Sequence, residues 1–198
     1  MLSKTLLKKL YVQKRISSAE IAKQLKCSAH KVNYWLEKFN IPKRTISEAI
    51  YNKANPNGDP FSFRKPHTPA ERFLYGLGIG LYWGEGTKRN KNSVRLGNSD
   101  PMLVKRFMDF LSVIYNVKKQ KLTFGLQIFG DMNASRTLAF WIKSLGVHRS
   151  QFYKPIVTPH RGVGNYRRKT QYGVMTVYFN NKKLRDIICH AIEEQSMN

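Results

Sequence analysis

The chain has 198 residues and a large positive charge, because 35 Lys and Arg stand against 12 Asp and Glu and give a formal net charge of +23. A surplus of this size destabilises a compact chain by self-repulsion unless a polyanion offsets it, which indicates nucleic acid as the partner. Two isolated cysteines exclude a disulfide framework. The lack of a long apolar stretch and of a signal peptide predicts a cytoplasmic protein, with no membrane and no small-molecule cofactor among its partners.

The first part of the sequence predicts a small all-helical domain, which we assign to residues 1–45. A first helix is expected from about Lys4 to Gln13, and the capping-box pattern of residues 17–20 predicts the start of a second helix. A third helix is expected over residues 29–39, with apolar residues at helical spacing: Val32, Trp35, Leu36 and Phe39. This pattern resembles the helix-turn-helix DNA-binding domains.

The resemblance implies that the third helix enters the major groove of DNA. If Val32 and Trp35 face the core, the residues turned outward include His30, Lys31, Asn33 and Tyr34, and we expect these four to bind DNA. A helical adaptor with the same packing is the alternative, and the basic composition of the chain favours DNA.

Residues 46–67 are expected to be a linker between two domains. A short helical stretch is predicted near residues 46–53. The segment that follows, residues 54–60, is too rich in Pro, Asn and Gly to pack as a regular element.

The second domain, residues 68–198, begins with a glycine-rich helix. A capping box at residues 68–71, with proline at the first helical position, predicts a helix from about Pro69 to Gly84. Apolar residues surround most of it, so we expect a buried central element. Glycine within a helix costs up to about 1 kcal/mol against alanine, and here three glycines four residues apart form one bare stripe: Gly76, Gly80 and Gly84.

A bare glycine stripe allows the backbone of a second helix to approach closely. Pairing two copies of this helix would place two Glu85 side chains near the axis between them, a layout suited to holding a divalent metal ion against a phosphodiester. The alternative is a buried helix with packing glycines and an incidental Glu85.

The end of this helix resembles the motif of the LAGLIDADG homing endonucleases. Laid on that nine-residue motif, residues 78–86 match at Gly80, Leu81 and Gly86. Gly84 stands for the small residue of the motif, and Glu85 replaces its metal-binding Asp.

The match has two departures, because the earlier acid of the motif is Trp83 here and its first leucine is Gly78. The resemblance covers about residues 68–195 and implies an α+β chain, in which the helix-turn-helix domain is followed by a LAGLIDADG-type αββαββα-like domain. An extra helix near residues 132–146 departs from that order.

The resemblance also implies a mechanism. One motif helix supplies one half-site, so we expect a homodimer that pairs through Gly76, Gly80 and Gly84 and recognises a nearly palindromic site. Glu85 of each subunit would bind Mg²⁺, which activates water and stabilises the leaving 3′ oxygen. Lys88, or another lysine near the base, is expected to stabilise charge on the phosphate.

The remaining elements of the second domain predict a sheet with helices on one face. Strands are expected over residues 93–97, 122–129, 152–158 and 172–179, and further helices after Asp100, after Asp131 and over the last residues. The other face of the sheet would lie in the major groove with Arg95 and Gln127 among its side chains. Basic loop residues would follow the phosphates: Arg89, Arg161, Arg167, Arg168 and Lys169.

Two functions remain open from the sequence. The first is a sequence-specific, Mg²⁺-dependent double-stranded DNA endonuclease of homing type, which Glu85 favours. The second is a transcriptional regulator that keeps the fold without cutting, which Trp83 and the helix-turn-helix pattern favour.

Overall fold

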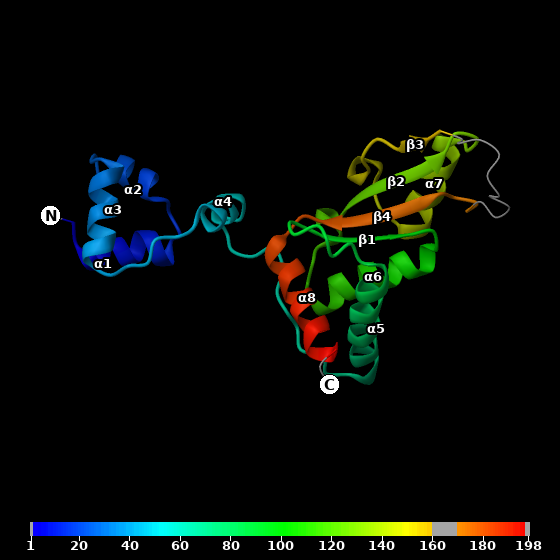
Figure 1. Ribbon diagram of the computed structural model, residues 1–198, viewed down its shortest axis with the longest axis horizontal. Helices are drawn as coiled ribbons and strands as arrows, with labels where there is room; N and C mark the ends of the chain where they lie inside the picture. Colours follow the sequence, from blue (N-terminus) through cyan, green and yellow to red (C-terminus); the bar gives the residue numbers. More distant parts are fainter. Residues whose placement is uncertain (1, 160–169, 197–198) are drawn as a thin grey trace. The chain divides into compact units, whose positions relative to one another are not determined.

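The computed structural model describes residues 2–159 and 170–196, and it confirms a chain of mixed α+β structure (Figure 1). The chain divides into two compact units, Met1–Pro60 (unit 1) and Phe61–Asn198 (unit 2). The division falls within residues 46–67, the expected linker. The first part of that segment is helix α4, Ile46–Ala54, in unit 1, whereas Phe61 is buried in the core of unit 2.

Unit 1 is built from short helices around a small apolar core. Helix α1, Lys4–Leu7, continues as a π-helical segment, Lys8–Gln13, and is followed by α2, Ser18–Gln24, and α3, Ala29–Lys38. The expected capping box is present, since the Ser17 hydroxyl accepts from the Glu20 N–H and the Glu20 carboxylate accepts from the Ser17 N–H at 3.0 Å. The core residues lie on the facing sides of these helices: Leu7, Leu10, Ile21, Val32, Leu36 and Ile41.

A single arginine ties the chain that leaves α3 back onto the first helical segment. The Arg44 guanidinium donates to the backbone oxygens of Arg15, Tyr11 and Ile16 at 2.7, 2.9 and 2.7 Å, and it lies 4.0 Å from the centre of the Tyr11 ring. Charge-assisted hydrogen bonds of this kind are about twice as strong as neutral ones. The start of α4 is therefore anchored to the core of unit 1.

Unit 2 is one four-stranded mixed sheet with helices packed on it. The elements in chain order are α5 (Pro69–Glu85), β1 (Val94–Asn98), α6 (Pro101–Ile114), β2 (Thr123–Phe129), α7 (Ala134–Leu145), β3 (Ile156–Thr158), β4 (Val174–Phe179) and α8 (Lys182–Ser196). The strand order is β1-β4-β2-β3, antiparallel except for the parallel pair β2 and β3. Helices α5, α6 and α8 lie on one side of this sheet (Figure 1).

Alternation along the strands separates a buried face from an open one. In β2 the residues Phe124, Leu126 and Ile128 are buried under the helices, as are Met175, Val177 and Phe179 in β4. The residues between them point to the side away from the helices, because successive side chains of a strand alternate. The sequence expectation for which residues share the open face is confirmed.

The expectation that α5 is a buried central element is wrong. Only Gly78, Ile79 and Tyr82 of this helix are buried, and 71 % of Phe73 is exposed. The buried side holds a glycine outside the expected stripe, since a Cβ at Gly78 would lie 2.1 Å from Cγ of Phe110. Gly78 therefore permits the close approach of α5 and α6 within one chain, and the stripe of Gly76, Gly80 and Gly84 does not.

Smaller differences concern the ends of elements. Helix α7 begins after Asn133, whose side chain accepts from the Arg136 N–H at 2.9 Å, and not after Asp131 as expected. Strand β3 starts at Ile156, later than the expected residue 152, because Pro155 precedes it and has no N–H for a ladder. In the described part of the chain, no helix has the length and apolar character needed to cross a bilayer.

Two glycines of α5 provide a matched test of this packing. Gly78→Ala should lower the free energy of unfolding by about 1–3 kcal/mol, because the added Cβ collides with Phe110 and overpacks the core. Gly80→Ala should raise it by up to about 1 kcal/mol through helix propensity, since a Cβ there meets nothing within 4 Å. Urea unfolding of the full chain at low, varied concentration measures both. Equal effects would contradict the α5–α6 contact.

Candidate nucleic-acid interface

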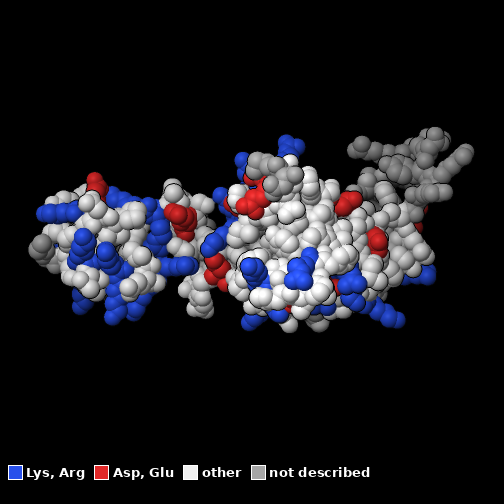
Figure 2. Space-filling view, turned by 90° about the horizontal axis from the view of Figure 1, so that it is seen from below, with Lys and Arg blue, Asp and Glu red and all other residues white. Residues whose placement is uncertain are grey.

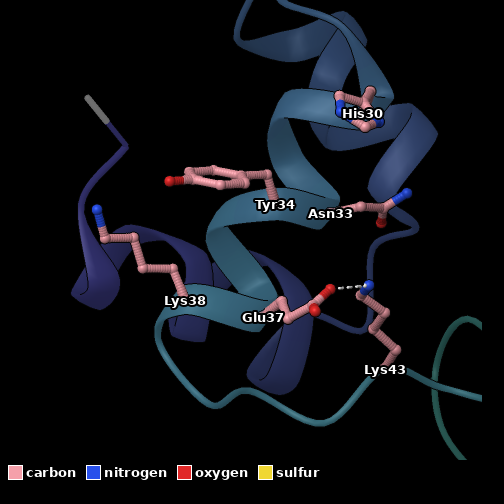
Figure 3. A pocket seen from close by; sticks show the side chains of 6 residues that line it. All are labelled: His30, Asn33, Tyr34, Glu37, Lys38 and Lys43. Atoms are coloured by element: carbon pink, nitrogen blue, oxygen red, sulfur yellow. Dashed lines mark hydrogen bonds and ion pairs between the residues drawn. The ribbon is translucent and has the colours of Figure 1, made fainter.

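Helix α3 presents one face of hydrogen-bonding side chains away from the core of unit 1. The helix starts at Ser28, whose hydroxyl accepts from the Lys31 N–H, and it is anchored by buried Val32 and Leu36. Figure 3 shows His30, Asn33 and Tyr34 projecting from this helix. They line a shallow concave surface together with Glu37, Lys38 and Lys43, which we call the α3 surface.

The sequence expectation for α3 holds in its geometry. His30 and Lys31 are exposed, 52 % of Tyr34 is exposed and Asn33 is half-buried, so all four stand outside the core. Trp35 is only partly buried, and its ring packs edge-on against Tyr34 at 5.5 Å between centroids. Tyr34 is thereby held beside the helix with its hydroxyl end toward solvent.

The α3 surface contains an ion pair that the sequence interpretation missed. Lys43 Nζ donates to Glu37 Oε2 at 2.7 Å, the dashed line of Figure 3. This hydrogen bond holds the pKa of the Glu37 carboxyl below its ordinary value. Glu37 lies one turn after Asn33 on the same helix, and that spacing indicates Glu37 as part of this surface but does not indicate Lys43.

Basic side chains dominate the visible face of unit 1, where Figure 2 shows many Lys and Arg and only isolated Asp and Glu. Most lysines of this unit are exposed, including Lys31, Lys38 and Lys43. A solvated protein face ordinarily mixes both signs of charge, so this excess creates a field that attracts a polyanion.

The open face of the sheet in unit 2 carries Arg95 and Gln127, as expected, together with Thr123, Thr176 and Tyr178. The structure brings two of them together, since the Arg95 guanidinium lies 5.3 Å from the centre of the Tyr178 ring. Gln127 Nε2 donates to Thr158 Oγ1 at 3.0 Å. Arg95 and Gln127 lie on strands that β4 separates, and each contacts another side chain.

The C-terminal end of α5 exposes Glu85 to solvent and gives Lys88 a structural role. Lys88 Nζ donates to the backbone oxygen of Trp83, one of the last carbonyls of the helix. A cation at this place satisfies the helix end and interacts favourably with its dipole. The geometry therefore assigns Lys88 to capping α5, and its ammonium group is held toward the helix backbone.

The turn after Glu85 is fixed from two sides. Gly86 donates to the Tyr82 oxygen at 2.9 Å, and a Cβ at Gly86 would lie 2.3 Å from that oxygen, so this turn requires glycine. Arg185 of α8 donates through Nη2 to the backbone oxygen of Lys88. Gly86 also forms an antiparallel bridge with Leu96, which places the residue after α5 beside β1.

The glycine stripe of α5 is an open surface in the single chain. Gly76, Gly80 and Gly84 are exposed, and a Cβ on any of them would meet nothing within 4 Å. Phe73 and Trp83, which are 71 % and 47 % exposed, extend this apolar surface toward both ends of the helix. Exposed aromatic side chains beside bare backbone form a surface that a partner helix can cover.

The other expected residues fall in different places. Arg89 is exposed in the turn between α5 and β1. Arg161, Arg167, Arg168 and Lys169 lie outside the described residues. Among residues 2–159 and 170–196, no group of three or more His, Cys, Asp or Glu is arranged to hold a metal ion, and Glu85 offers a single carboxylate.

Comparisons of this chain with known protein families, with curated proteins and with solved structures found no match. The residues and their geometry are therefore the basis for a functional conclusion.

Proposed function

We propose that this protein binds double-stranded DNA in a sequence-specific way. The observation that carries the proposal is the α3 surface, where His30, Asn33 and Tyr34 stand outward from a helix anchored by buried apolar residues in a chain of net charge +23. A helix-turn-helix reading of unit 1 places α3 in the major groove, where side-chain amides and imidazoles read base edges.

Unit 2 supplies a second DNA-binding surface in this proposal. A LAGLIDADG-type arrangement would set the open face of the sheet in the major groove, with Arg95 and Gln127 near the bases. Arg89 and the basic residues 161, 167, 168 and 169 would contact phosphates on either side. The partner is DNA inside the cell, so a cytoplasmic location belongs to the same proposal.

A homodimer follows from the open side of α5. Two copies would pair through Gly76, Gly80 and Gly84, where each backbone is bare enough for close approach. A two-fold axis along this contact implies a nearly palindromic DNA site, because each subunit meets the same half-site.

A second function, cleavage of the bound DNA, is favoured by the position of Glu85. Glu85 is exposed at the C-terminal end of α5, so pairing two copies of this helix would bring two carboxylates near each other. Mg²⁺ in proteins is typically held by one or two carboxylates with substrate phosphate oxygens, which fits this donor set. When bound, the ion would activate water for phosphodiester hydrolysis. If the protein does not cleave DNA, the same DNA-binding surfaces would suit a transcriptional regulator.

The affinity for DNA should fall steeply with salt concentration. Substitutions should distinguish residues that contact bases from residues that contact phosphates. The logarithm of the association constant falls by about 0.9 per neutralised phosphate for each unit of log salt concentration. Asn33→Ala should cost about 1–3 kcal/mol on a selected site and little on unrelated duplex, whereas Lys31→Ala should weaken both equally. Fluorescence anisotropy on selected and scrambled duplexes measures this, and a flat salt response would contradict the proposal.

The dimer should be visible by sedimentation as a species of about twice 23.0 kDa. Gly80→Leu should shift it to monomer, because the leucine side chain would occupy the space needed by the second helix. Met102→Ala is the control, since Met102 is an exposed apolar residue on a different helix. A wild-type protein that stays monomeric at high concentration refutes the pairing.

Cleavage should appear when the full chain, Mg²⁺ and a randomised duplex library are incubated together. Glu85→Gln should abolish the cleavage products while leaving DNA affinity unchanged, because it replaces the negatively charged metal ligand by a neutral amide of similar volume. Binding without cleavage in Mg²⁺ and in Mn²⁺ would eliminate the endonuclease and leave the regulator.

A further inference from the structure

Glu37 is an acid at a place where a DNA-binding surface has reason to avoid one. It is the one acidic residue among the six that line the α3 surface. A carboxylate facing a polyanion weakens binding by like-charge repulsion. Its presence in so basic a chain therefore needs an explanation from folding or from recognition.

Folding does not account for the Glu37 carboxylate. The other acids of unit 1 each hold a local structure: Glu20 and Glu48 complete capping boxes, and Asp59 accepts from the Tyr51 hydroxyl at 2.9 Å. Glu37 accepts from Lys43, and both side chains are exposed, by 75 % and 48 % respectively. Exposed ion pairs contribute little to stability, so unit 1 does not depend on this one.

The position of Glu37 suits base recognition. Asn33 and Glu37 are four residues apart on α3, a rise of about 6 Å along its axis. Stacked base pairs are about 3.4 Å apart, so a helix lying along the groove sets the two side chains against base pairs one or two steps apart. Both residues line the same concave surface, and Figure 3 shows them on the side of the helix where Lys43 approaches.

The hydrogen-bonding chemistry of a carboxylate restricts the bases that it can recognise. An ionised Glu only accepts hydrogen bonds, and the cytosine N4 amino group is a donor in the major groove with no acceptor beside it on the same base. Guanine and the thymine O4 present acceptors, which repel a carboxylate. Adenine offers its N6 donor next to the N7 acceptor, which makes it the second choice.

We propose that Glu37 selects a cytosine in the DNA site by accepting a hydrogen bond from the N4 amino group, and that Lys43 then moves from Glu37 to a phosphate. This assignment rests on the proposed DNA-binding function. The exchange links base recognition to affinity, because a base amino group that takes the place of Lys43 on the carboxylate frees the ammonium group for the DNA backbone. At an incorrect base Glu37 keeps its hydrogen bond with Lys43, and this bond competes with the phosphate contact.

The test begins with selection of duplexes from a randomised library by the full-length protein. The wild type should enrich a cytosine at one position within one or two base pairs of the position that Asn33→Ala relaxes. Glu37→Gln should remove the cytosine preference there and leave the other positions unchanged, because glutamine both donates and accepts. Glu20→Gln is the matched control, since it removes the same charge from unit 1 while glutamine still serves in a capping box.

Salt dependence tests the role of Lys43 separately. On the selected site the wild-type slope of log affinity against log salt should be larger by about 0.9 than on a duplex with that cytosine replaced, which is one phosphate contact. Lys43→Met should abolish this difference while the cytosine preference remains.

Three outcomes overturn the inference, and they are distinguishable from one another. Identical base preferences for wild type and Glu37→Gln refute Glu37 as a specificity residue while DNA binding stands. If Glu20→Gln loses the cytosine preference as much as Glu37→Gln does, the preference depends on net charge and not on Glu37. A wild type that binds no duplex at all removes the proposed function itself, and the inference with it.

Discussion

The contact between α5 and α6 at Gly78 determines which side of α5 is packed within unit 2 and which side stays exposed for a partner. The Phe110 ring occupies the space that a side chain at position 78 would fill, so the two helix backbones approach closely on that side. Gly76 and Gly80 are each two residues away, about 200° around the helix. They therefore face the opposite direction. One helix is thus packed tightly on one side within its own chain and left bare on the other, and Glu85 is exposed at its C-terminal end.

The two units are stabilised by different interactions. Unit 1 has a small core and depends on local hydrogen bonds, in which capping boxes fix the starts of α2 and α4 and Arg44 ties the chain after α3 to Tyr11. Unit 2 depends on a larger apolar core between sheet and helices. In both units acids are few, and Glu20, Glu48, Glu71 and Asp100 serve at helix starts, which leaves the surface strongly positive.

Local patterns in the sequence predicted most helices and strands. They did not predict how residues far apart in the sequence pack together. The capping boxes at Ser17 and Thr68 and the alternation of β2 depend on near neighbours, and the structure confirms them. The burial of α5 was mispredicted because composition alone does not reveal which side of an apolar helix a sheet covers. The start of α7 was misplaced by two residues, because Asp131 and Asn133 have equal capping ability and only the fold chooses between them.

The candidate site was predictable to a similar extent. Helical periodicity placed His30, Asn33 and Tyr34 outward, but the partner of Glu37 comes from a segment beyond the end of α3, so no helical pattern indicates it. The sequence analysis expected Lys88, or another nearby lysine, to stabilise charge on the phosphate. Its hydrogen bond to Trp83 depends instead on how the chain turns after the helix, which Gly86 makes possible.

The bond from Arg185 to the Lys88 carbonyl joins the last helix of the chain to the turn that follows Glu85. Segments tied in this way tend to open together, as one cooperative unit of local unfolding. Fraying of α8 would then release the turn as well, and backbone amides around residues 86–88 would lose protection from hydrogen exchange in step with those of the first turn of α8. The turn that follows the acid at the end of α5 is thus held by a residue 97 positions later in the chain.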